Sequence, residues 1–385
     1  MKYTVNKPKV DIGSYRHYWR GTPKVGKTTM FRDLILSAYG SPEYGFLISL
    51  GNEYGHEALN NVVAVKAEAW KDFIFYVDDL VKNKADNNFK LIALDTVDQL
   101  VAIARKRVYE LHREIFKWDA KSDETLMGGF GKGNIKISEI ITEQLNRLQK
   151  SGYGLVFIGH TKEKGITEDD TQFSVLVGSL PESLDKIFLN IADIFAMICE
   201  QHDVVKGTGK LDQKDDIIKN AKIDGVSRYV YFRSEDGTMK CGSRFPHLPE
   251  RVELLSTEYH SADEYLKAFN AAVAYSAQIK TDELKKAQED EAKEKEKVAE
   301  QYRNTEPKMN DVGEVVDEEA ELQEKIMAIC KKHGKTGTNN PEIMPIVRKY
   351  SVDGNPRSAH GIETLTAFYN ELVEFDNNQT NQSTN

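Results

Sequence analysis

The chain has 385 residues, of which 40% are apolar and 29% charged, and its formal net charge is −9. This length suggests one main domain with a smaller addition. No apolar run approaches the roughly 20 residues that cross a bilayer, and the first residues show no secretory signal, so we expect a cytoplasmic protein that contacts no membrane. The three cysteines are widely spaced and match no zinc or disulfide pattern, as in proteins of a reducing compartment.

The charge is unevenly distributed along the chain. Residues 1–275 contain 37 Lys and Arg against 39 Asp and Glu, whereas residues 276–385 contain 15 against 22. The first part therefore lacks the basic excess that is typical of nucleic-acid-binding proteins, although a local basic groove is compatible with a neutral total.

Short apolar strands alternate with amphipathic helices from Tyr15 to about Leu255, which predicts an α/β domain with a mainly parallel sheet. We expect strands at Tyr15–Arg20, Tyr44–Leu50, Phe89–Leu94, Gly154–Gly159 and Ile191–Cys199, and helices at Thr28–Tyr39, Ala69–Val81, Val97–Lys117 and Ile135–Lys150. Residues 161–181 predict an irregular loop. Arg228–Arg233 and Met239–Arg244 flank Asp236-Gly237, which predicts a hairpin.

The composition changes after about Tyr275. Residues 279–318 are rich in Lys, Glu, Asp and Ala and predict a charged linker at 276–318, either a solvated helix or a flexible segment. Its acidic excess favours a solubilising linker, with a regulatory tail that competes with DNA as the alternative. Apolar periodicity returns in residues 319–375 and predicts a small domain of about three helices, and residues 376–385 predict a disordered tail. The expected domains are thus 1–275, 276–318, 319–375 and 376–385.

One segment matches the phosphate-binding loop pattern without a mismatch. Glycines let a backbone wrap closely around phosphates, and the N-terminus of the following helix adds its partial positive charge. Lys27 would bind the β- and γ-phosphates of ATP, and Thr28 would offer its hydroxyl to Mg²⁺. A chance glycine turn is the alternative. The residues assigned to this nucleotide site are Gly21, Thr22, Pro23, Lys24, Val25, Gly26, Lys27, Thr28 and Thr29.

Asp95 ends an apolar strand, at the edge where α/β sheets bind ligands. Beside the loop it would hold Mg²⁺ directly or through water, although a helix N-cap is the alternative role. Hydrolysis needs a base to position water, and Glu53, after the second strand, is the candidate. Glu57 and Asp98 compete with it, and an exposed loop glutamate is the alternative. His160 ends the strand expected beside Asp95, where it would sense the γ-phosphate or simply end a strand.

Basic residues late in the chain suggest a contact between subunits. Arg244, with Lys240 nearby, would reach the nucleotide of a neighbouring subunit and stabilise charge in the transition state, unless both belong to a solvated strand face. Two loops, residues 127–134 and 161–180, carry lysines that could face nucleic acid, but acidic residues in the second argue against simple phosphate tracking.

The order of these motifs resembles a known family. The phosphate loop, Glu53, Trp70, Asp95-Thr96, His160-Thr161 and the closing Lys240-Cys241-Gly242-Ser243-Arg244-Phe245-Pro246 follow one another as in the phage-encoded RecA-like ATPases, the ATP-binding single-strand annealing proteins of phage recombination systems. The resemblance covers about residues 10–255. It departs at the first strand, which is unusually polar, and at residues 161–181, which are unusually acidic.

The resemblance implies a RecA-like P-loop core that binds ATP and Mg²⁺. It also implies single-stranded DNA as a partner, a ring or filament of identical subunits, cooperation with a single-strand-binding protein, and the cytoplasm of a host cell as the location. Lys27 and Thr28 match the nucleotide site, Asp95 the magnesium site, Glu53 the catalytic glutamate and His160 the γ-phosphate sensor. Arg244 matches the intersubunit basic residues more loosely.

The expected function is an ATPase, with hydrolysis coupled to DNA binding, in DNA recombination or single-strand annealing. The alternatives are a nucleotide-switched replication accessory or loader, and a small-molecule kinase. A kinase would need an arginine-rich lid, which the sequence lacks.

Overall fold

The computed structural model describes residues 8–168, 171–205, 222–234, 237–280, 283–307, 309–310, 313, 318–333, 343–351 and 353–382. The chain divides into two compact units. The first consists of Met1–Glu306 with Asp311–Gly313, and the second of Pro307–Asn310 with Glu314–Asn385. Among the described helices, none is long and apolar enough to cross a membrane.

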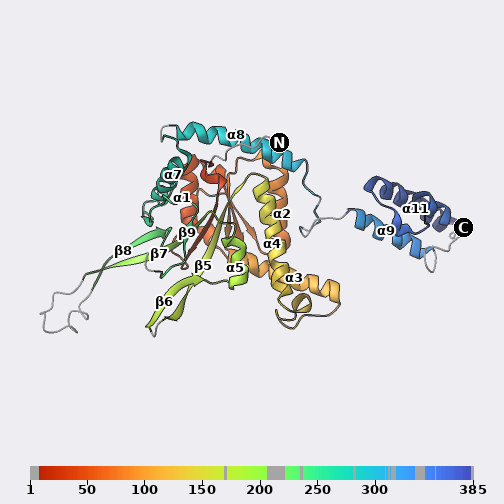
Figure 1. The fold of residues 1–385 in the computed structure, drawn as a ribbon, viewed down its shortest axis with the longest axis horizontal. Coiled ribbons are helices and arrows are strands. Elements are labelled where there is room, and N and C mark those ends of the chain that lie inside the picture. Colours follow the sequence, from red (N-terminus) through yellow and green to blue (C-terminus); the bar gives the residue numbers. More distant parts are fainter. Residues whose placement is uncertain are drawn as a thin grey trace. The chain divides into compact units, whose positions relative to one another are not determined.

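The first unit is built on a large, mainly parallel sheet, which confirms the predicted α/β fold (Figure 1). The strand order is β10-β8-β7-β1-β5-β4-β2-β3, and the six strands from β7 to β3 are parallel. β8, β9 and β10 are antiparallel additions, and β6 pairs with β5. The strands are β1 Arg16–Gly21, β2 Gly45–Leu50, β3 Ala64–Ala67, β4 Leu91–Asp95, β5 Gly154–Glu168, β6 Thr171–Gly178, β7 Ile194–Val205, β8 Lys222–Tyr231, β9 Gly242–Ser243 and β10 Arg251–Glu253.

Helices cover both faces of the sheet, so that two apolar layers form (Figure 1). Phe31 of α1 and Phe269 of α7 belong to one layer, and Phe73 of α2, Leu100 of α3 and Ile141 of α4 to the other. Within a helix such buried residues recur at helical spacing, as Phe73, Val77 and Leu80 do in α2, which is why the sequence predicts α1 to α4. The helices α5 and α7 were not predicted. The helices of this unit are α1 Lys27–Tyr39, α2 Trp70–Lys82, α3 Val97–Phe116, α4 Lys132–Lys150, α5 Glu182–Leu189, α7 Asp263–Ala277 and α8 Leu284–Arg303.

The polar first strand, β1, lies at the centre of the sheet between β5 and β7. Its polar side chains are tolerated there because each makes at least one hydrogen bond or ion pair, although the Arg20 Nε atom has no partner among the described residues. Arg16 donates to Asp193 at 2.6 and 2.7 Å, Tyr18 donates to Asp185 at 2.9 Å, and Arg20 pairs with the same Asp185. The polar sequence thus marks a buried strand with its own hydrogen-bond network.

Two predictions about loops and hairpins are wrong. Residues 161–181 are mostly not irregular, because β5 continues without a break from the sheet into a hairpin with β6, with Thr161 opposite Gly178. The hairpin predicted around Asp236-Gly237 does not form, because β8 and β9 both pair with β7 instead of with each other. Asp236 lies outside the described residues. The alternation of polar and apolar residues and the presence of turn residues indicate where strands lie. They do not specify which strands pair with each other.

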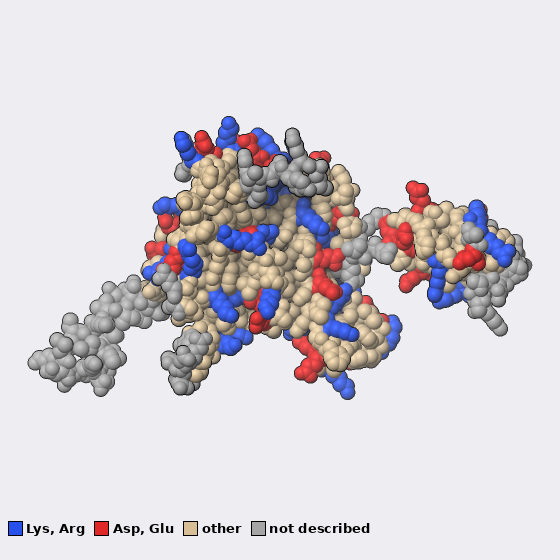
Figure 2. Space-filling view, in the orientation of Figure 1, with Lys and Arg blue, Asp and Glu red and all other residues tan. Residues whose placement is uncertain are grey.

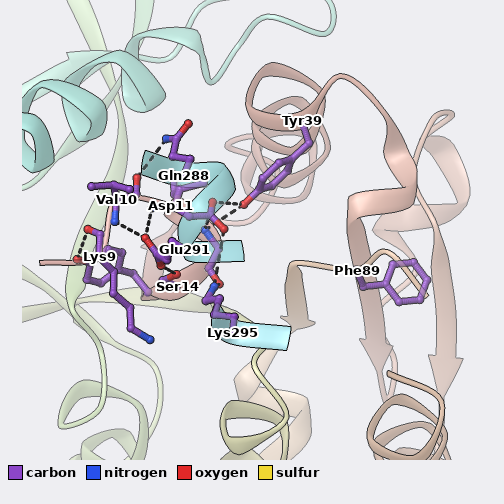
Figure 3. A network of polar contacts seen from close by, with 12 residues as sticks. Lys9, Val10, Asp11, Ser14, Tyr39, Phe89, Gln288, Glu291 and Lys295 are labelled. Carbon is purple, nitrogen blue, oxygen red and sulfur yellow. Dashed lines mark hydrogen bonds and ion pairs between the residues drawn. The ribbon is translucent and has the colours of Figure 1, made fainter. Parts of the chain in front are cut away.

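The predicted linker at 276–318 contains α8, so a helix, one of its two expected forms, is present, and more than half of its residues are exposed. Composition did not predict that one side of this helix binds the core. The Glu291 side chain of α8 accepts hydrogen bonds from the backbone N–H groups of Val10 and Asp11 and from the Ser14 hydroxyl, and Lys295 Nζ donates to Gly13 O at 2.7 Å (Figure 3). These contacts are charge-assisted and long-range, so a composition-based argument does not detect them.

The second unit contains α9 Glu318–Lys332, α10 Met344–Tyr350 and α11 Ile362–Gln382. Ile326, Val347, Leu365 and Phe368 are fully buried in its apolar cluster. The predicted disordered tail at 376–385 is wrong in its first part, since α11 continues to Gln382, and residues 383–385 lie outside the described residues.

Candidate functional site

The phosphate-loop pattern lies between the end of β1 and the start of α1. Gly26 has φ +101°, a left-handed conformation that favours glycine, and directly precedes the first helical residue, Lys27. Thr22, Pro23 and Lys24 are exposed, Gly21 and Val25 are buried, and Thr29 is half-buried. The loop thus presents a helix N-terminus with exposed backbone before it, an arrangement suited to an anion.

Lys27 lies against the loop itself. Its Nζ donates to Gly21 O at 2.9 Å and to Thr22 O at 2.8 Å. Burial lowers the pKa of Lys27 to about 8, and the nearby carboxylates of Asp95, Glu53 and Asp98 oppose this shift. An ammonium group in so poorly solvated a place would gain strongly from a phosphate anion.

Thr28 and Asp95 meet at the end of β4. The Thr28 hydroxyl donates to Asp95 Oδ2 at 2.7 Å, and Asp95 is only 4% exposed. Burial, helped by the nearby Glu53 carboxylate, raises the pKa of Asp95 to about 6, although the Thr28 hydrogen bond and the Lys27 charge oppose the shift. No group of three or more His, Cys, Asp or Glu side chains able to hold a metal is found among the described residues. One hydroxyl and one carboxylate nevertheless fit Mg²⁺, which takes one or two protein oxygens and fills its other positions with phosphate and water.

Glu53 follows β2 and lies near the same edge. Its Oε1 accepts a 3.4 Å hydrogen bond from the Thr96 hydroxyl, next to Asp95. The loop that carries it is held by the Ser49 hydroxyl, which donates to Glu53 O at 2.8 Å. Glu57 is exposed on the 3₁₀ turn Gly55–Ala58, so of the two glutamates Glu53 is the one placed beside Asp95.

His160 and Asp98 lie near Lys27 and Glu53 and complete the group of polar side chains around the phosphate loop. The His160 backbone N–H donates to Asp98 Oδ2 at 3.0 Å, and the Ser179 hydroxyl also donates to Asp98. Burial and the Lys27 charge lower the pKa of His160, and the carboxylates of Asp98 and Glu53 oppose this shift, so the environment favours the neutral imidazole. Asp98 is occupied by these contacts, which favours Glu53 over it as the water-positioning base.

A protein-family model described as "AAA domain" matches residues 14–240, more than half of the chain. The chain belongs to the AAA domain family. No curated protein matches the chain. Family membership makes the chain a nucleotide-binding protein of the P-loop ATPase type, and the matched range contains the phosphate loop, Glu53, Asp95 and His160.

Arg244 does not lie near the phosphate loop or the side chains that surround it, which are Lys27, Thr28, Asp95, Glu53 and His160. It follows β9, where Ser243 pairs with Ile194 at the start of β7, whereas the phosphate loop lies at the opposite ends of the parallel strands. The Arg244 guanidinium is 3.0 Å from Asp193 Oδ1, and its side chain is 60% exposed. Within the chain, Arg244 and Lys27 therefore lie at opposite ends of the parallel strands.

Sequence reasoning missed one residue that contacts the loop. Arg228 of β8 lies beside Gly26, so close that a Cβ atom added at Gly26 would come within 2.8 Å of Arg228 Nη1. Its guanidinium also donates to Val25 O at 3.5 Å. No motif marks Arg228, because its proximity to the loop depends on β8 lying two strands from β1 in the sheet.

Proposed function

We propose that this AAA domain protein is a Mg²⁺-dependent ATPase that acts on single-stranded DNA in recombination or annealing, of the kind encoded by phages. The observation that carries the proposal is the convergence of Lys27, Thr28, Asp95, Glu53 and His160 at one edge of the sheet. Phosphate binding, metal binding, water positioning and γ-phosphate sensing each find a residue of suitable chemistry there.

The route from the site to DNA would be β5. This strand leaves the sheet at His160 and becomes the hairpin with β6, which projects from the core (Figure 1). Lys162 and Lys164 are exposed on the hairpin, with Glu163 between them. On the face drawn in Figure 2, basic and acidic side chains are mixed over the described surface, which favours a local DNA contact over a broad basic surface.

The proposal includes self-association and a protein partner. Arg244 is exposed and remote from its own phosphate loop, so it would meet a nucleotide only across a contact between subunits. A ring or filament of this kind would act together with a single-strand-binding protein, and the second unit, α9 to α11, offers a separate surface for such a partner.

The deciding experiment is ATP turnover by the purified chain with and without single-stranded DNA, with Lys27→Ala as the control. DNA-stimulated turnover that the variant loses would support the proposal. ATP binding without stimulation by DNA would contradict it and favour a nucleotide-switched accessory protein.

A further inference from the structure

A small pocket adjoins the phosphate loop on the side of α1. Its cavity volume is about 180 Å³, and Gly26, Thr29 and Arg32 of the loop and α1 line one side. Arg228 of β8 and residues 254–258 line the other. Pockets that enclose a drug-sized ligand measure about 300–1,000 Å³, so this one holds only part of a nucleotide.

The outer wall of the pocket is fastened to the phosphate-loop helix. The Asp33 carboxylate, fully buried in α1, accepts from the Ser261 backbone N–H at 3.2 Å and also from the Ser261 hydroxyl. The Leu254 N–H donates to Arg228 O at 2.7 Å. The wall therefore keeps its position relative to the loop, as a preformed binding site requires. Residues 254–261 lie beyond the range 14–240 that the AAA domain model matches.

The two arginines of the pocket differ in their partners. Arg32 is bound to Asp33 Oδ1 at 2.7 Å, and its guanidinium lies 4.6 Å from the centre of the Tyr259 ring. Arg228 has only long hydrogen bonds, 3.5 Å to Val25 O and 3.4 Å to the Ser256 hydroxyl, and no carboxylate pairs with it among the described residues. Its planar guanidinium is therefore available to a ligand, and such groups stack well on aromatic faces.

We propose that this pocket receives the base of the nucleotide whose phosphates the loop holds, and that Arg228 lies against the face of that base. The inference rests on the proposed nucleotide site. The loop places the phosphates at Gly26 to Thr28, and the pocket opens beside Thr29, where the nucleoside end of the molecule continues. β8 and residues 254–258 would thus determine how strongly the chain prefers a nucleotide over bare phosphates.

The test compares two ligands that share a triphosphate and differ in the nucleoside. Isothermal titration calorimetry measures the dissociation constants of ATP and of inorganic tripolyphosphate, both with Mg²⁺, for the full chain. We expect Arg228→Ala to weaken ATP about 10-fold and to leave tripolyphosphate within about twofold. Ser256→Trp places a large side chain in the pocket from an exposed position, so it should also weaken ATP binding and leave tripolyphosphate binding nearly unchanged. Arg251→Ala removes an equal charge from the adjacent strand β10, outside the pocket, and should change neither ligand.

Arg228→Lys separates stacking from charge. It should bind ATP as weakly as Arg228→Ala, because an ammonium group has no plane. Two results would overturn the inference. If Arg228→Lys binds ATP normally, the charge of Arg228 is what matters, as for a contact with the phosphates. If Arg228→Ala loses affinity for ATP and tripolyphosphate equally, Arg228 acts on the phosphates or on the loop. Equal affinity of the unmodified chain for ATP and tripolyphosphate would overturn the inference alone. Binding of neither ligand by the unmodified chain would overturn the proposed function together with it.

Discussion

The hydroxyl of Thr28 donates a 2.7 Å hydrogen bond to the carboxylate of Asp95, 67 residues away in the chain. The contact joins the first turn of α1 to the end of β4 and brings together the two protein oxygens that Mg²⁺ would need. It also makes the site sensitive to the protonation of a single carboxyl group, since Asp95 is almost fully buried.

Protonation of Asp95 should therefore control metal binding. Burial holds the pKa of Asp95 at about 6, above its usual range, so its carboxylate is mostly ionised at pH 7.5 and mostly protonated at pH 5. Because Mg²⁺ binds the ionised form, we expect the Mg²⁺ concentration needed for half-maximal ATP turnover to rise by up to about tenfold per pH unit below 6. Mg²⁺ titrations between pH 5 and 8 measure this, and a requirement independent of pH would contradict the assignment.

The same shift affects the stability of the chain without nucleotide. A carboxyl group whose folded-state pKa is raised favours folding when protonated, so this contribution is present at low pH and is lost as the pH rises through about 6. Asp95→Asn cannot ionise. The stability gained by the variant relative to the unmodified chain should therefore be larger at pH 7.5 than at pH 4.5 in urea denaturation, and an equal difference at both pH values would refute the shift.

Lys27→Ala should lower ATP turnover by roughly 10²-fold or more, because it removes the charged donor to the transferred phosphate. Lys71→Ala is the control, since Lys71 is an exposed lysine of α2 and does not belong to the loop. A phosphate-release assay compares the two. Equal activity in the two variants would mean that the loop does not hold ATP as assigned.

Glu53→Gln should separate ATP binding from hydrolysis. A glutamine keeps the size and the contact with Thr96 but cannot accept a proton from water, so turnover should fall by roughly 10²–10⁴-fold while ATP affinity changes little. Glu57→Gln on the exposed turn provides the comparison. If Glu57→Gln lowers turnover and Glu53→Gln does not, the base is misassigned.

Glu291→Ala should destabilise the first unit by about 1–3 kcal/mol, since it leaves the backbone N–H groups of Val10 and Asp11 without their acceptor (Figure 3). Glu294→Ala, on an exposed position of the same helix, should have little effect. Urea denaturation of the full chain measures both. Equal stability of the two variants would show that α8 contributes nothing through this contact.

The double variant Lys162→Ala/Lys164→Ala tests the proposed DNA contact. Each phosphate contact to a single strand adds about −0.7 to the slope of log affinity against log salt, so removing two should reduce the slope by about 1.4. Fluorescence anisotropy with a labelled oligonucleotide at several salt concentrations measures it. Lys285→Ala/Lys286→Ala on α8 is the control, and an equal effect of both pairs would indicate only a general charge effect.

The sequence was most informative where local rules determine the structure. The phosphate loop, the apolar strand before Asp95 and the amphipathic helix that begins at Trp70 follow from spacing and periodicity alone. The hairpin that follows His160 was missed. Its first strand is the second half of β5, and the residues there are polar, a composition that is more typical of a loop than of a strand. Arg228 and Glu291 were missed for another reason. Their partners lie 203 and about 280 residues away in the chain, and no local pattern specifies such pairs.

β5 is one continuous strand that belongs to two sheets. Its first seven residues lie in the core sheet and the next eight form one arm of the hairpin, which at about 3.3 Å per residue extends some 26 Å. Because the backbone runs unbroken from the core sheet into the hairpin, a rotation of about 10° about His160 would displace the far end of the arm by about 5 Å.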